Sequence, residues 1–123
     1  MVTAGTFRLP GPLAVADVQV DIMSGGRVEL GLGTGWCDAE HTACGIGFPP
    51  LETRFEQLEE QLQLMCGPWA SDGPYSFHGR HYDLVGNPGL ARPRRPADAA
   101  PAVLMLRRPY RGRAGPADLR RPC

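Results

Sequence analysis

The feature that most restricts the fold is the stretch RVELGLG at residues 27–33. Its apolar residues recur at every second position, which is the period of a β-strand. Gly31, Gly33 and Gly35 take the opposite phase, so one face of this strand carries almost no side chains. An open face of this kind leaves room for a bulky neighbour or a ligand close to the backbone.

A helix is predicted before this strand, over residues 11–24. Pro12 suits the first turn of a helix, and the pair Gly25–Gly26 suits its end. The spacing predicts a buried apolar face, widened by Val15, Val18 and Ile22, and a separate acidic face. The predicted apolar positions are Leu13, Ala16, Val20 and Met23, and the predicted acidic positions are Asp17 and Asp21.

A second helix is predicted over residues 53–66. Thr53 and Glu56 have the spacing of a capping box, in which the two side chains satisfy free backbone N–H groups at the start of a helix. Apolar residues then follow at steps of three and four, as on the buried side of a helix. The pair Gly67–Pro68 predicts where this helix ends.

The other segments complete an alternating pattern. Residues 1–7 predict a short strand, residues 36–52 a loop, and residues 74–84 a hairpin around Gly79. The run PAVLML at 101–106 is the only later segment with the composition of a strand. Strands that alternate with helices predict an α/β fold built from βαβ units with a parallel sheet.

Charge divides the 123 residues at about residue 91. Residues 1–91 carry four arginines against eleven carboxylates, a net charge of −7, and residues 92–123 carry nine arginines against two, a net charge of +7. A basic, proline-rich tail suits binding to nucleic acid or to an acidic partner. The alternative is a tail that is out of frame or disordered. We expect one domain over 1–91, followed by this tail over 92–123.

No segment has the length and apolar character of a membrane span or a secretory signal, so the composition predicts a cytoplasmic protein without membrane contact.

Several motifs together resemble the bacterial luciferase-like monooxygenase superfamily, and most closely its deazaflavin- or flavin-dependent actinobacterial branch. They are TFRLPGPLA, DIMSGGRVELGLGTGW, GIGFPPLETRFEQLEEQLQLM and YSFHGRHYDL, in this order over residues 1 to about 90. The resemblance implies a fragment of a (β/α)8 TIM barrel, about strands 3 to 5 with their helices, followed by an irregular Arg/Pro-rich tail.

The resemblance also implies a function. Members are oxidoreductases or monooxygenases that use FMN or the deazaflavin coenzyme F420 on a small organic substrate. A chain with only part of the barrel is expected to be inactive alone, unless a complementing chain or a second copy completes it. The alternative is a small non-enzymatic module whose Arg-rich tail binds nucleic acid or an acidic partner, of which nucleic acid is the less favoured.

The resemblance places cofactor-binding residues at two strand ends. Small residues there allow a flat ring to approach the backbone, although tight packing of the chain itself would need the same residues. The cofactor-binding residues are Thr3, Ala4, Gly5, Gly33, Thr34 and Gly35.

Three further residues lie in the expected catalytic loop. Trp36 is expected to form an apolar wall of the substrate pocket, with a core or rim tryptophan as the alternative. Glu40 is expected beside the same pocket. His41 is the candidate general acid or base, with a solvated or hydrogen-bonded loop histidine as the alternative.

No metal site is expected. Cys37, His41 and Cys44 form C-x3-H-x2-C, and His78 and His81 form H-x-x-H. Neither group has the four closely spaced ligands that a structural zinc ion needs.

Overall fold

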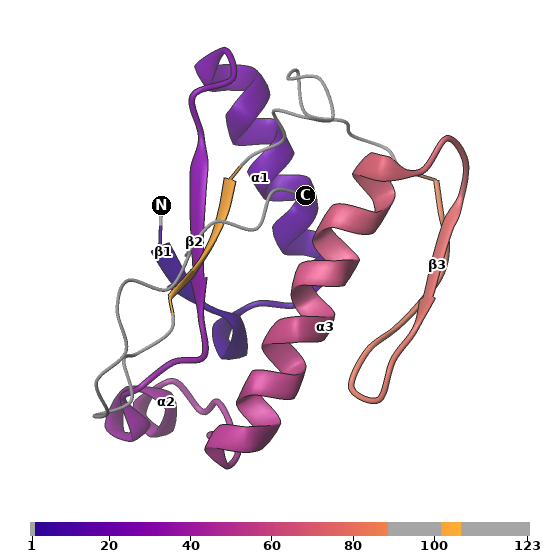
Figure 1. Ribbon diagram of the computed structural model, residues 1–123. Coiled ribbons are helices and arrows are strands. Elements are labelled where there is room, and N and C mark those ends of the chain that lie inside the picture. The colour runs from indigo at the N-terminus through magenta and orange to yellow at the C-terminus, as the bar shows by residue number, and fades with distance from the viewer. Residues whose placement is uncertain (1, 89–101, 107–123) are drawn as a thin grey trace, which may run out of the picture.

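The computed structural model describes residues 2–88 and the backbone of residues 102–106 (Figure 1). Three parallel strands form one sheet in the order β1-β2-β5. They are β1 (Val2–Ala4), β2 (Glu29–Gly33) and β5 (Ala102–Leu106). The predicted α/β fold with a parallel sheet is confirmed, as is the strand near 101–106.

Three helices and a hairpin accompany this sheet. The helices are α1 (Pro10–Ser24), α2 (Asp38–Ala43) and α3 (Leu51–Ala70), and the antiparallel hairpin consists of β3 (Tyr75–His78) and β4 (Asp83–Asn87). The predicted hairpin is therefore confirmed. Figure 1 shows it on the side of α3 that faces away from the parallel sheet.

The core lies between one face of β2 and two helices. Leu30 and Leu32 are fully buried and belong to one cluster with residues of α1 and α3, including Val18 and Met65. Successive side chains of a strand point to opposite faces, so α1 and α3 cover the leucine face, and the glycines of β2 lie on the other face. This distribution matches the alternation in RVELGLG.

The first strand is shorter than predicted. It ends at Ala4, and Gly5–Phe7 form a turn of 3-10 helix instead of continuing to residue 7. The amide of Gln61, on α3, explains the change, because its Nε2 donates to the carbonyl oxygens of Gly5 at 3.0 Å and Arg8 at 3.2 Å. These bonds bend the chain away from the sheet.

Helix α3 differs from the prediction at both ends. It starts at Leu51 after Pro50, with no side-chain cap, so the predicted capping box of Thr53 and Glu56 does not form. It continues through Pro68 to Ala70. Both Pro68 and Trp69 are buried, and this burial compensates for the backbone hydrogen bond that a proline lacks.

The loop predicted over residues 36–52 is also wrong in one part, because it contains the short helix α2. Six residues are too few to show helical periodicity in a sequence. Its formation depends on the contacts of His41, which is buried.

The orientation of α1 differs in part from the predicted faces. Asp17 and Asp21 are completely buried, whereas Val20 is 45% and Met23 85% exposed. Leu13 and Val18 lie on the buried face beside the two carboxylates. The helix carries more apolar residues than one face can hold, so spacing alone did not determine which face packs inward. Its end at Gly25 is as predicted, with φ at 71° and the N–H bonded to Asp21 and Ile22.

Among the described residues, no helix is long and apolar enough to cross a membrane.

Candidate functional site

The candidate site lies where β1 and β2 end. Ala4 pairs with Gly33 in register, so the carboxyl ends of the two strands are adjacent at one edge of the sheet. All six residues predicted to bind a cofactor lie at this edge or directly after it. Gly5 and Gly33 are buried, whereas Thr3, Ala4, Thr34 and Gly35 are half-buried. The structure therefore brings the six residues together, as expected for parallel strands.

Arg54 holds the segment that follows β2. Its Nη1 donates to the carbonyl oxygens of Gly35 at 2.6 Å and Thr34 at 3.3 Å, and its Nε donates to that of Pro49 at 2.9 Å. The guanidinium carbon also lies 3.9 Å from the centre of the Phe48 ring, which gives a cation–π contact. Burial lowers the pKa of Arg54 from its ordinary value. This side chain fixes the path of the backbone through Thr34 and Gly35.

Sequence reasoning missed Arg54. One signal was present: an arginine in the first turn of a helix stands where the helix dipole disfavours a positive charge. Such a residue needs a compensating contact, which here is the set of backbone carbonyl oxygens.

His41 is 1% exposed and lies between the rings of Phe7 and Phe48, with both ring centroids 4.5 Å away. Its Nδ1 donates to the carbonyl oxygen of Cys37 at 2.7 Å. The other ring nitrogen, Nε2, shares a hydrogen bond with the hydroxyl of Thr6, at 2.6 Å. Both ring nitrogens are therefore hydrogen-bonded. The Thr6 hydroxyl connects this buried ring to the surface of the protein.

Gly35 is required beside this pair. Its φ is +78°, and a Cβ atom there would lie 3.2 Å from both His41 Cε1 and Thr6 Oγ1. Gly45 also has a positive φ, at +66°, but a Cβ atom there would meet nothing within 4 Å. A side chain at position 35 therefore meets two restrictions, backbone strain and crowding, whereas one at position 45 meets only the first.

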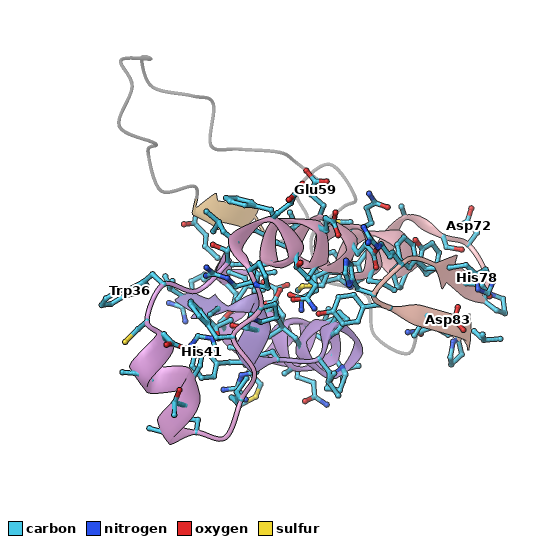
Figure 2. All side chains as sticks on the ribbon, turned by 90° about the horizontal axis from the view of Figure 1, so that it is seen from below. Trp36, His41, Glu59, Asp72, His78 and Asp83 are labelled. Atoms are coloured by element: carbon cyan, nitrogen blue, oxygen red, sulfur yellow. The ribbon has the colours of Figure 1, made fainter. Side chains whose placement is uncertain are left out.

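Trp36 and Glu40 lie apart from His41. Trp36 is 81% exposed, and Figure 2 shows its indole projecting away from the body of the protein, while His41 lies on the inner side of α2. Glu40 is exposed on α2. The described residues do not form a pocket wall around the Trp36 indole.

An open pocket of about 250 Å³ adjoins this edge. It lies between the turn Gly5–Phe7, the segment around Gly47, and the hairpin. Its polar lining comes from Thr6, Arg8, Gln57 and Tyr82. Thr6 thus links the pocket to the buried ring of His41.

The described histidines and cysteines lie in more than one part of the structure. In residues 2–88, no three His, Cys, Asp or Glu side chains gather closely enough to hold a metal ion. Cys37 and Cys44 are free thiols. His78 pairs with Asp83 at 2.5 Å, and His81 with a carboxylate of α3 at 2.9 Å.

A parallel α/β sheet covered by helices on one face, with small residues at its carboxyl edge, is the site architecture of α/β enzymes. Residues 1–114 match the model of the luciferase-like monooxygenase family, and the chain belongs to that family. The resemblance inferred from the sequence motifs is confirmed.

Related sequences carry two kinds of name. The chain is 35% identical over 116 residues to an F420-dependent glucose-6-phosphate dehydrogenase of Amycolatopsis mediterranei, which covers 89% of this chain and 33% of the relative. It is 36% identical over 86 residues to the pyrimidine monooxygenase RutA of Stutzerimonas stutzeri, which covers 67% of this chain and 23% of the relative. The chain thus spans a third or less of the length of these relatives.

Solved structures show the same fold. Monooxygenase RslO1 from Streptomyces bottropensis superposes with a TM-score of 0.70 at 21% identity, and covers 85% of this chain and 30% of its own. EDTA monooxygenase (EmoA) from Chelativorans sp. BNC1 superposes with a TM-score of 0.71 at 23% identity, and covers 85% of this chain and 28% of its own.

Proposed function

We propose that the chain is part of a flavin- or deazaflavin-dependent oxidoreductase or monooxygenase that acts on a small organic substrate. The observation that carries the proposal is the register of β1 and β2, which joins six small residues at one carboxyl edge. Family membership supports it, as do the names of relatives that depend on F420 or, in Pseudomonas putida, on FMNH2. The cofactor is accordingly FMN or coenzyme F420.

The residues at this edge fit a flat ring system. No side chain among the six is larger than threonine, and Thr3, Ala4 and Thr34 are half-buried, so the ring can approach their backbone. Gly5 and Gly35 contribute differently. The space next to Gly5 is filled by Gln61, and the space next to Gly35 by His41 and Thr6. These glycines therefore allow close packing of the protein's own side chains against the edge.

The roles of the surrounding residues follow from their positions. When bound, the cofactor supplies hydride transfer or oxygen activation, and the protein supplies position and electrostatics. Arg54 keeps Thr34 and Gly35 in place, and the hydrogen bond with His41 holds the Thr6 side chain at the wall of the adjoining pocket. The exposed Trp36 and Glu40 are assigned to the substrate side, where a further part of the enzyme would cover them.

The proposal includes the larger assembly. In it, β1, β2 and β5 are about the third to fifth strands of a TIM barrel, and a complementing chain or a second copy supplies the missing units. The chain alone is then inactive. The match to about a third of each relative's length supports only the assignment of these strands to part of a barrel. A cytoplasmic location is proposed on composition alone.

The division into a domain of residues 1–91 and a basic tail of residues 92–123 also stays a proposal. Most of the tail lies outside the described residues, and so does the question of its reading frame. No observation on the described residues favours the alternative of a module that binds nucleic acid or an acidic partner.

The test is a titration of the 123-residue chain with FMN and, separately, with coenzyme F420. Quenching of the cofactor's own fluorescence measures the binding. We expect saturable binding of one of the two, weakened at least tenfold by Gly35→Ala, because the added methyl group displaces His41 and Thr6 behind the edge. Gly45→Ala is the matched control, since it adds the same methyl at a positive φ into open space.

Circular dichroism establishes that both variants are folded. If the folded chain bound neither cofactor, or if both variants lost affinity equally, this edge would not be the cofactor site.

A further inference from the structure

The pocket beside the candidate site has its own chemistry, which the proposed function does not use. We propose that it binds a small oxyanion, a phosphate or carboxylate group, through Arg8 and Tyr82. The proposal is independent of the cofactor, because it depends only on the residues that line this pocket.

The first argument is charge. Among the described residues, Arg8 is the only charged one in the lining, and no carboxylate contributes to it. Within residues 2–88, the Arg8 guanidinium makes no hydrogen bond or ion pair, although its backbone is held at both ends: its N–H donates to Gly5 at 3.1 Å, and its carbonyl oxygen accepts from Gln61. An arginine with its planar donors free beside a pocket suits a carboxylate or a phosphate.

The second argument is a fixed hydroxyl donor. The Tyr82 oxygen accepts a hydrogen bond from Gln61 Nε2 at 2.8 Å. That amide cannot turn round, because the same Nε2 also donates to the carbonyl oxygens of Gly5 and Arg8, and a flipped amide would place oxygen against oxygen. The Tyr82 oxygen is therefore an acceptor toward Gln61, and its own proton remains available to a ligand in the pocket.

The third argument concerns the carboxylates next to Gln57 on α3. Glu56 is paired with Arg80 at 3.1 Å and with His81 at 2.9 Å. Glu60 accepts three backbone N–H bonds from the hairpin. The charge of Arg80 offsets that of Glu56, and the Glu60 oxygens are occupied by the hairpin amides, which reduces the repulsion of an anion near Arg8.

Size and lining define the ligand. A volume of about 250 Å³ accommodates a phosphate or carboxylate group with a few further atoms. The rest of the wall is apolar and includes Phe7, Leu9 and Ile46. The site therefore fits the anionic end of a small organic molecule better than an extended polyanion.

The experiment is isothermal titration of the full chain with inorganic phosphate and, separately, with acetate, at constant ionic strength set with sodium chloride. We expect saturable phosphate binding, weakened about tenfold in Arg8→Gln and about fivefold in Tyr82→Phe, as for loss of a charge-assisted and a neutral hydrogen bond. Arg27→Gln is the matched control, because Arg27 is an exposed arginine outside the pocket. The affinity of this variant for phosphate should equal that of the wild type.

The ligands separate the two chemistries. Binding of phosphate alone assigns a phosphate group, and comparable binding of acetate assigns a carboxylate. The proposal would be overturned by no saturable binding of either anion, or by equal losses in Arg27→Gln and Arg8→Gln, which would indicate general attraction to positive charge. Tyr82→Phe keeps the ring in place, so it tests the donor even if Arg8→Gln is poorly folded.

Discussion

At the scale of single residues, the most unusual feature is a pair of carboxylates inside the protein. Asp17 and Asp21 lie one turn apart on α1, are completely buried, and find no hydrogen-bond partner for either oxygen among the described residues. Burial, and then the neighbouring Asp21, raise the pKa of Asp17 from 3.8 to about 6. Burial without a hydrogen-bond donor among the described residues favours the protonated form of such a carboxylate.

The raised pKa of Asp17 predicts how stability depends on pH. Below pH 4 the carboxyl is protonated in both the folded and the unfolded chain, so its ionisation does not change the free energy of unfolding. Between pH 4 and 6 the unfolded chain releases a proton that the folded chain retains, and the free energy of unfolding decreases by up to about 3 kcal/mol. Above pH 6 this decrease in the free energy of unfolding is complete and no longer changes with pH.

Asp17→Asn should remove this dependence and stabilise the folded chain at pH 7 by about 1–3 kcal/mol, measured by urea denaturation from pH 4 to 8. Asp38→Asn, at an exposed position on α2, is the control and should keep the wild-type pH profile. A profile for Asp17→Asn that still declined between pH 4 and 6 would assign the titration to another group.

At the scale of elements, local pattern predicted the parts whose residues repeat regularly. The strand at 27–33, the first helix and the hairpin were predicted to within a few residues of β2, α1 and β3–β4. Elements determined by distant partners were not. The strand β1 ends early because Gln61, 56 residues further along the chain, bonds to Gly5. Nothing in residues 1–7 carries that information.

In the candidate site too, the sequence predicted some features and the structure was needed for others. The family resemblance predicted the six small residues as a group, and the structure brings them to one edge because the carboxyl ends of neighbouring parallel strands meet there. The structure adds the bonds that hold this edge. The contacts of Arg54 with Gly35, and of His41 with Thr6, join residues 19 and 35 positions apart. Such pairs have no periodicity, so reading the sequence could find the residues but not their partners.

The connection between the hairpin and α3 depends on one carboxylate. The Glu60 oxygens accept N–H bonds from Arg80 at 2.8 Å, His81 at 3.0 Å and Tyr82 at 3.0 Å. Burial acts to raise the pKa of Glu60, but these three backbone bonds and the nearby His81 together lower it. The connection is therefore strongest when Glu60 is ionised, and it weakens as the pH falls through the lowered pKa.

Glu60→Gln should release the turn of the hairpin, because an amide oxygen is a weaker acceptor and the amide nitrogen accepts nothing. Hydrogen exchange measured by NMR should show at least tenfold faster exchange at the three amides of Arg80, His81 and Tyr82. Glu59→Gln, at the exposed neighbouring position, should leave these rates unchanged. Equal acceleration in both variants would mean that the charge of α3, and not the Glu60 bonds, holds the turn.

At the scale of the whole molecule, the parallel sheet has an open edge within the part of the chain that the structure describes. Among the described residues, β1 pairs with β2 alone, so its other edge offers free backbone N–H and C=O groups. Val2 on this strand is 68% exposed. Helix α1 adds an exposed apolar surface that includes Val20 and Met23. Exposed strand edges and apolar helix faces are surfaces on which chains associate.

We therefore expect the chain to self-associate through β1 as its concentration rises. Val2→Lys should shift the molecule toward the monomer, because a charged side chain on an edge strand opposes pairing with another edge. Val85→Lys makes the same change at a valine that is 73% exposed on β4, in the separate hairpin sheet, and should leave association unchanged. Sedimentation velocity over a range of concentrations measures the distribution of species.

If Val85→Lys reduced association as strongly as Val2→Lys, added charge alone would explain the effect. A wild-type chain that remained folded and monomeric at every concentration would show that the β1 edge is not a pairing surface between copies. Association that depends on Val2 and not on Val85 instead identifies the open side of β1 as the place where a second copy can add to the parallel sheet.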